Sequence, residues 1–212
     1  MIKESGLTAR ETERRKTIIG IWLIPITSNN KIFVVENLIA KFQSQKVPGQ
    51  LNCPAETYNA SVDSTFMDTL KRASDEEIGF LDYQPKMLKA LGLIRMPNTD
   101  EPVIAIPYLI PVESEGSIIF MPKDYLESRH PRWIRLEEID DRKLNIGRFE
   151  VPMFRSPMQE IVQLIRDRQA GRGSQLIHSR EPLIPQEVYD YLQGDQRPDS
   201  ISGNSPLNKS GF

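Results

Sequence analysis

The chain has 212 residues, of which 39% are hydrophobic and 26% are charged, and this ordinary composition predicts one globular domain with appendages. Its net charge of −2 argues against the broadly basic surface that a duplex DNA-binding protein needs. Cys53 is the only cysteine, which excludes an intramolecular disulfide and a cysteine-rich zinc site within one chain.

The first sixteen residues are mostly polar and charged, so we expect residues 1–16 to form a solvated arm. They lack an apolar core followed by small residues, and no apolar run in the chain approaches the roughly 18 residues of a membrane span. We therefore expect a soluble, cytoplasmic protein that does not contact a membrane.

A hairpin is predicted directly after the arm. The runs TIIGIWLIPI and KIFVVENL are rich in β-branched and aromatic residues, and the turn-forming triplet Ser28-Asn29-Asn30 separates them. Residues 39–60 contain the breakers Pro48, Gly49 and Pro54, and we expect them to be irregular.

An amphipathic helix is predicted next, with Ser61 as its N-cap. Val62, Phe66 and Leu70 recur every four residues, which places them on one face. Gly79 is expected to end the helix in a position that tolerates positive φ.

The remaining pattern predicts strands and then a closing helix. A second hairpin is expected from residues 87–96 and 102–112, shorter strands at 118–121 and 132–136, and a helix over 156–170. Residues 17–170 therefore read as one α/β layered domain. Residues 171–193 are expected to be a linker with a short helix, and the polar residues 194–212 a disordered tail.

The segment RASDEEIGF, residues 72–80, resembles the second half of the Nudix box. Arg72, Glu76, Glu77 and Gly79 fall on positions of that motif, and Phe80 takes its final apolar position. The predicted order of strands and helices also matches this superfamily over about residues 17–170. The resemblance implies a Nudix-like α/β/α sandwich, with a central mixed sheet between helices.

The resemblance also implies a function for these residues. Glu76 and Glu77 would bind Mg²⁺ or Mn²⁺, Glu77 would take part in catalysis, and Arg72 and Gly79 would brace the box, with Asp68 or Ser64 as the partner of Arg72. Diphosphate groups concentrate negative charge, which hard cations neutralise through oxygen ligands, so carboxylates must converge on one spot. On a regular helix, side chains at 73, 76 and 77 share a face.

The box is degenerate. Counting back from Arg72, the first glycine of the motif falls on Tyr58 and its first glutamate on Ser64, and the glutamate that follows the arginine is replaced by Ala73. The Pro48-Gly49 pair resembles the glycine-rich turn of the family but lies about eight residues further upstream, which suggests an insertion at 50–58.

Another acid must therefore complete the site if the chain is an efficient enzyme. Glu127, six residues before Trp133, is the first choice as a catalytic loop glutamate. Arg129 and Arg132, in the cluster RHPR, are expected to hold substrate phosphates.

Two hypotheses about function follow, together with a third interpretation of the motif. The first is a metal-dependent hydrolase that cleaves the diphosphate bond of a nucleotide-type substrate. The alternative is a catalytically impaired Nudix-fold module that binds a nucleotide or a protein, with a homodimer or another partner docking through the C-terminal region, where Val188, Tyr189 and Leu192 form an apolar face. The third reading is an unrelated α/β domain with an accidental motif.

Overall fold

The computed structural model describes residues 17–41, 46–96, 102–123, 128–139, 142–155, 157–172, 177–178 and 186–194. The predicted arm and residues 195–212 of the predicted tail lie outside these ranges. The strands are β1 Ile18–Ile26, β2 Lys31–Asn37, β3 Leu51–Asn52, β4 Ala55–Thr57, β5 Gly79–Leu81, β6 Lys89–Ala90, β7 Ile94–Met96, β8 Val103–Pro111, β9 Ile118–Phe120, β10 Ser128–Arg135, β11 Lys143–Ile146, β12 Phe149–Pro152 and β13 Ile177–His178; the helices are α1 Phe66–Ala73, α2 Pro157–Gln169 and α3 Gln186–Gly194.

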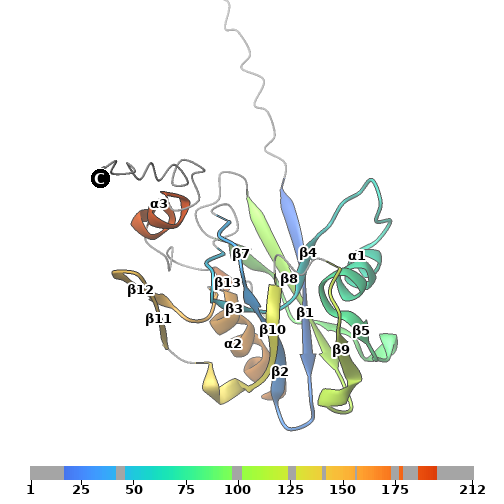
Figure 1. Cartoon of the computed structure of the whole chain (residues 1–212). Helices are drawn as coiled ribbons and strands as arrows, with labels where there is room; N and C mark the ends of the chain where they lie inside the picture. The colour runs from blue at the N-terminus through green and yellow to red at the C-terminus, as the bar shows by residue number, and fades with distance from the viewer. Residues whose placement is uncertain are drawn as a thin grey trace, which may run out of the picture.

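A mixed sheet forms the centre of the molecule, in the order β10-β2-β1-β8-β7-β13 (Figure 1). Strands β1 and β8 run parallel along their whole length, whereas β2 is antiparallel to β1 and to β10. The predicted fold class and the first hairpin are therefore confirmed. In the second predicted hairpin, β7 pairs antiparallel with β8.

Each face of the sheet carries its own apolar cluster. Along β1, Trp22, Ile24 and Ile26 pack in the cluster that includes α2, whereas Ile21 and Leu23 pack in the cluster that includes α1. A strand covered on both faces reads as a continuous apolar run, which is why IIGIWLIPI shows no alternation. The helices α1 and α2 thus cover opposite faces.

Residues 50–58 are more ordered than their breakers predict. Strand β3 pairs with β2, and β4 pairs with β1, so this segment joins the sheet where β1 and β2 diverge. Pro54 lies between the two short strands, and its carbonyl accepts a hydrogen bond from the Leu23 N–H at 2.9 Å. The prediction of an irregular segment was wrong here, because pairing with neighbouring strands overrides local propensity.

The helix α1 begins four residues later than predicted. Thr65 is its N-cap, and Thr65 and Asp68 form a reciprocal capping box, in which the Asp68 carboxylate accepts from the Thr65 N–H at 2.7 Å. Val62 precedes the helix and is 67% exposed. Its four-residue spacing from Phe66 matches a helical repeat, but the capping box of Thr65 and Asp68 sets the first residue of the helix.

The C-terminal helix α3 packs against its own chain. Val188 is fully buried with Val47 and Val151, and Leu192 contributes to the same small cluster beside the β11–β12 hairpin (Figure 1). Val188 and Leu192, two of the three residues that we expected to receive a partner, therefore pack within the chain. None of the described helices is long and apolar enough to cross a membrane.

Candidate active site

The box segment ends in an unusual helical turn. After Ala73 the chain widens into a π-helical turn, Ser74–Ile78, which Gly79 closes with its N–H donating to the Ser74 carbonyl. Single π turns occur often at functional sites. The wider turn changes the angle between successive side chains, so the common face predicted for 73, 76 and 77 does not hold as it would on a regular helix.

Gly79 is required at this position for two reasons. Its φ of +103° lies in a region that disfavours side chains, as predicted, and a Cβ built on it would lie 2.6 Å from the Met121 carbonyl oxygen. The approach is close because the Met121 N–H donates to the Ile78 carbonyl at 2.6 Å, and the Lys123 N–H donates to the Glu76 carbonyl at 2.8 Å. The box and residues 121–123 are thus joined by their backbones.

Arg72 is the centre of an ion-pair network. Its guanidinium donates to Asp63 at 2.8 and 3.2 Å and to the Thr57 carbonyl at 2.8 Å, and it lies 3.1 Å from a Glu56 oxygen. The side chain of Asp63 is 3% exposed and also accepts from Thr69. The hydrogen bond from Arg72 holds the pKa of Asp63 well below its usual range.

The contacts of this network correct the predicted partner of Arg72, and its bracing role stays a prediction. Asp68 is engaged in the capping box, and the acid opposite Arg72 is Asp63, one residue before the motif position at Ser64. Asp63 lies in the loop before α1, where it also accepts from the Asn59 N–H at 3.0 Å. Arg72 thereby connects β4, this loop and the end of the helix.

The brace should be measurable as acid-sensitive stability. Arg72→Met leaves the nearly buried Asp63 without its cation, and we expect a melting temperature about 6 °C or more below wild type at pH 7. Because the pKa of Asp63 is lowered on folding, the contribution is complete above its unfolded value of about 4 and is lost as the pH falls below it.

Thermal melts between pH 7 and pH 3 check this expectation, with Lys71→Met as a control that removes an exposed neighbouring cation. The gap between wild type and Arg72→Met should narrow below about pH 4. A gap of the same size at pH 3 and pH 7 would show that the ion pair does not carry the effect.

The two box glutamates have different surroundings. Glu76 lies 3.7 Å from Arg72 and 3.8 Å from the Lys123 ammonium, so two cations border its carboxylate. Glu77, the next residue, is half-buried. Ala73 is fully buried in the core with Leu70 and Ile78, where it offers no oxygen ligand.

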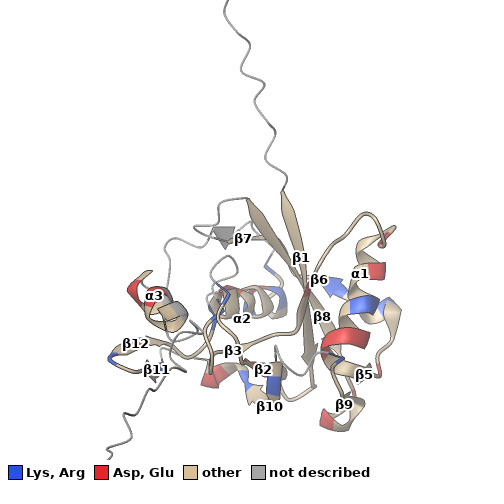
Figure 2. Ribbon diagram, turned by 45° about the horizontal axis from the view of Figure 1, so that its top comes forward, with Lys and Arg blue, Asp and Glu red and all other residues tan. Residues whose placement is uncertain are grey.

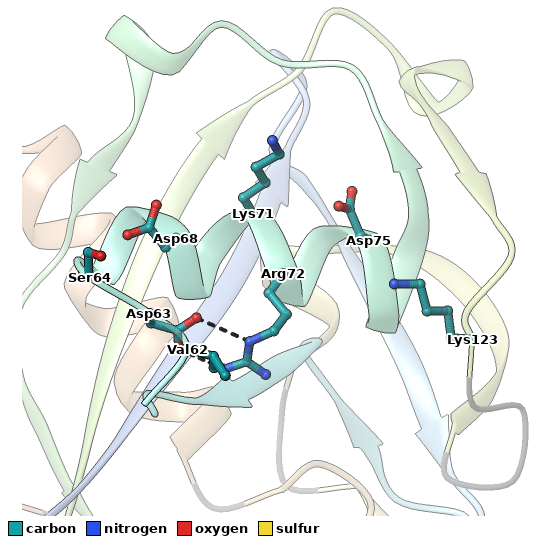
Figure 3. Close-up of a pocket in the computed structure, with 8 residues that line it drawn as sticks. All are labelled: Val62, Asp63, Ser64, Asp68, Lys71, Arg72, Asp75 and Lys123. Carbon is teal, nitrogen blue, oxygen red and sulfur yellow. Dashed lines mark hydrogen bonds and ion pairs between the residues drawn. The ribbon is translucent and has the colours of Figure 1, made fainter. Parts of the chain in front are cut away.

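An open hollow of about 380 Å³ lies along the solvent side of α1 (Figure 3). Both acidic and basic residues line it, and the ribbon of α1 in Figure 2 carries segments of both kinds. Arg72 turns toward Asp63, while the Lys123 side chain comes from the neighbouring segment to the end of the helical turn that carries Asp75. The lining residues are Val62, Asp63, Ser64, Asp68, Lys71, Arg72, Asp75 and Lys123.

The acidic side chains of the box are the candidates for a metal site. Among the described residues, no group of three or more His, Cys, Asp or Glu side chains is arranged to hold a metal ion. Glu127, the acid predicted to complete the site, lies outside the described residues. What the structure provides is two adjacent glutamates at the end of the helix, and carboxylate oxygens are donors that suit Mg²⁺.

The predicted phosphate ligands lie on the other side of the sheet. Arg129 and Arg132 pair in register with Glu36 and Val34, and Val34 packs in the cluster that includes α2. Arg132 also contacts the Glu36 carboxylate at 3.3 Å. Their role toward a substrate stays a prediction. The cations beside Glu76 are Arg72 and Lys123.

No protein-family model and no curated protein matches the sequence. The structure is similar to the NUDIX domain of Shewanella oneidensis NrtR, solved with ADP ribose, at 11% identity and a TM-score of 0.52 over 73% of this chain and 89% of that one. It is also similar to a MutT/nudix family protein from Enterococcus faecalis, at 16% identity and a TM-score of 0.54 over 75% of this chain and 64% of that one.

A MutT NUDIX hydrolase from Burkholderia pseudomallei matches over 71% of this chain and 98% of its own, at 12% identity and a TM-score of 0.52. At such identities the likeness shows the fold alone. The chain has the Nudix fold, as the box and the order of elements predicted, and the reading of the motif as an accident in an unrelated fold was wrong.

Proposed function

We propose that this protein hydrolyses the diphosphate bond of a nucleotide-type substrate, using Mg²⁺ or Mn²⁺ bound through Glu76 and Glu77. The observation that carries the proposal is the position of these adjacent carboxylates at a π-helical turn braced by Arg72, within a Nudix fold. The solved neighbour from S. oneidensis holds ADP ribose, in which a diphosphate joins adenosine to ribose, and this supports the same substrate class.

Two glutamates fit a metal that arrives with its substrate. Mg²⁺ dehydrates reluctantly and is usually held by one or two carboxylates together with substrate phosphates, rather than by a complete protein cage. When bound, the metal lowers the pKa of a water molecule and neutralises charge on the phosphate oxygens.

The chain's own residues have separate tasks in this proposal. Glu77 and Glu76 position the metal, and Glu127 is the candidate for taking a proton from the attacking water. Lys123, whose side chain is 67% exposed and lies 3.8 Å from Glu76, can move its ammonium to a phosphate oxygen. Arg72 stays with Asp63 and holds the turn in place.

A panel of diphosphate compounds, including ADP ribose, nucleotide sugars and dinucleotide polyphosphates, tests the proposal. We expect turnover that requires added Mg²⁺ or Mn²⁺ and stops with a chelator. Titration of the protein with Mn²⁺ alone should show no tight site, and a site should appear when a diphosphate is present. A tight metal site without diphosphate would contradict metal delivery by the substrate, and turnover in excess chelator would exclude the proposed chemistry.

The second candidate is a nucleotide-binding module with little or no hydrolysis. Two observations favour it. Ala73 stands where the motif has a glutamate and is buried in the core, and two cations border the Glu76 carboxylate. Binding of ADP ribose without turnover, in the presence of Mg²⁺ or Mn²⁺, would support this candidate over the first.

A further inference from the structure

Buried polar side chains lie at one end of β2. Asn37, the last residue of the strand, is fully buried, and neither its amide nitrogen nor its amide oxygen has a hydrogen-bond partner in the described part of the chain. Asn52 is 3% exposed, and its amide oxygen also has no partner there. Buried polar groups are normally paired, and each unpaired one costs stability, so a pair of such residues calls for an explanation.

The strand register places these residues on one face. Asn37 is directly opposite Ser128 of β10, and Asn52 is opposite Val35 of β2. Cross-strand partners share a face, as do alternate residues of one strand, so all three polar residues face the same way as Val35. Val35 packs in the cluster that contains Leu70 and Ala73 of α1, so the polar residues lie on the α1 side of the sheet.

We call Asn37, Asn52 and Ser128 the polar floor. The polar floor lies within reach of the box. The backbone of Lys123 is hydrogen-bonded to that of Glu76, and Ser128 follows five residues later. Five residues of fully extended chain span at most about 17 Å. A ligand whose diphosphate meets Glu76 and Glu77 can therefore extend its nucleoside end as far as Asn37.

We infer that the polar floor reads the base of the nucleotide, with the Asn37 amide donating to and accepting from one base edge. An amide of asparagine matches adenine, which presents a donor and an acceptor side by side at N6 and N7. The unpaired oxygen of Asn52 offers a second acceptor. This inference rests on the proposed function, since it identifies the adenine nucleotides as the substrate class of the same site.

Binding measurements with three probes separate this inference from the proposed function. Isothermal titration calorimetry in the presence of Mg²⁺ compares the binding of ADP, IDP and inorganic pyrophosphate. The base of IDP has an oxygen acceptor in place of the N6 amine, and pyrophosphate has no base. We expect wild type to bind ADP about tenfold or more tightly than IDP. Pyrophosphate should bind in a manner that depends on Mg²⁺ and on Glu77.

Asn37→Leu, which keeps the branched outline of the side chain but is apolar, should bring the affinities for ADP and IDP to within about twofold of each other, with pyrophosphate binding unchanged. Its melting temperature should stay equal or rise, because an unpaired buried amide is removed. Asn52→Leu provides a second test if Asn37→Leu fails to fold, and it should also weaken the binding of ADP. Leu93→Ala, at an exposed apolar position, is the control.

The outcomes are distinct. Pyrophosphate binding with no preference of wild type for ADP over IDP, or an unchanged preference in both leucine variants, would overturn the reading of the base and leave the proposed function standing. If a leucine variant loses stability but still prefers ADP over IDP, the asparagine amide binds a structural water molecule instead of the base. That result would also overturn the inference. Absence of metal-dependent pyrophosphate binding would instead count against the proposed function.

Discussion

Gly79→Ala is expected to lower the free energy of unfolding by about 3 kcal/mol or more. The alanine Cβ would lie 2.6 Å from the Met121 carbonyl oxygen, and backbone atoms cannot turn away as the end of a side chain can. The positive φ of 103° adds conformational strain. Relief requires residues 121–123 to separate from the π turn, which removes the hydrogen bonds at Ile78 and Glu76.

Denaturant unfolding of the variant measures this loss. Gly171→Ala is the matched control, because Gly171 also has a positive φ, of 70°, but nothing lies within 4 Å of its added Cβ. That control should cost only about 1 kcal/mol, the part due to φ. Equal losses in the two variants would show that the contact with Met121 does not constrain the site.

Glu77→Gln is expected to reduce turnover of the best substrate by about a hundredfold or more without altering the fold. The change keeps the size of the side chain and removes the negative charge that the proposal assigns to metal binding. Steady-state rates at increasing Mg²⁺ measure the effect, and a higher Mg²⁺ requirement should accompany the lower rate.

Asp75→Asn is the control for charge, since Asp75 belongs to the same π turn but lines the outer hollow beside Lys71. It should retain most of the activity. If Asp75→Asn and Glu77→Gln lose activity equally, the general negative charge of the turn and not a ligand position is responsible. If neither loses activity, Glu77 has no part in the reaction.

The sequence predicted the fold more fully than the site. The long apolar strands β1, β2 and β8 carry their own signal, and the spacing of Arg72, Glu76, Glu77 and Gly79 identified the family resemblance. Strands β3 and β4 could not be read, because two or three residues beside prolines gain their pairing only from neighbours distant in sequence. Tertiary contacts decide such short elements.

Within the site, the partner of Arg72 was misplaced by one or more residues. Asp63 lies in a loop, where no helical register fixes the position of an acid, so counting from Arg72 did not find it. The π turn could not be predicted from the sequence either, because a widened turn has no signature in composition. The polar floor gave no signal at all, since Asn37 and Ser128 are 91 positions apart and meet only through strand pairing.

The brace at Arg72 has a consequence for how the site responds to ligands. Helix α1 has eight residues and the π turn that continues it has five, and isolated helices shorter than about 12–15 residues are marginal in water. The arrangement of the glutamates therefore depends on the contacts of Arg72 with β4 and the Asp63 loop, together with the backbone hydrogen bonds to residues 121–123. Occupancy of the site and cooperative folding of the domain are thus thermodynamically linked, and a ligand that binds there stabilises the whole domain by mass action.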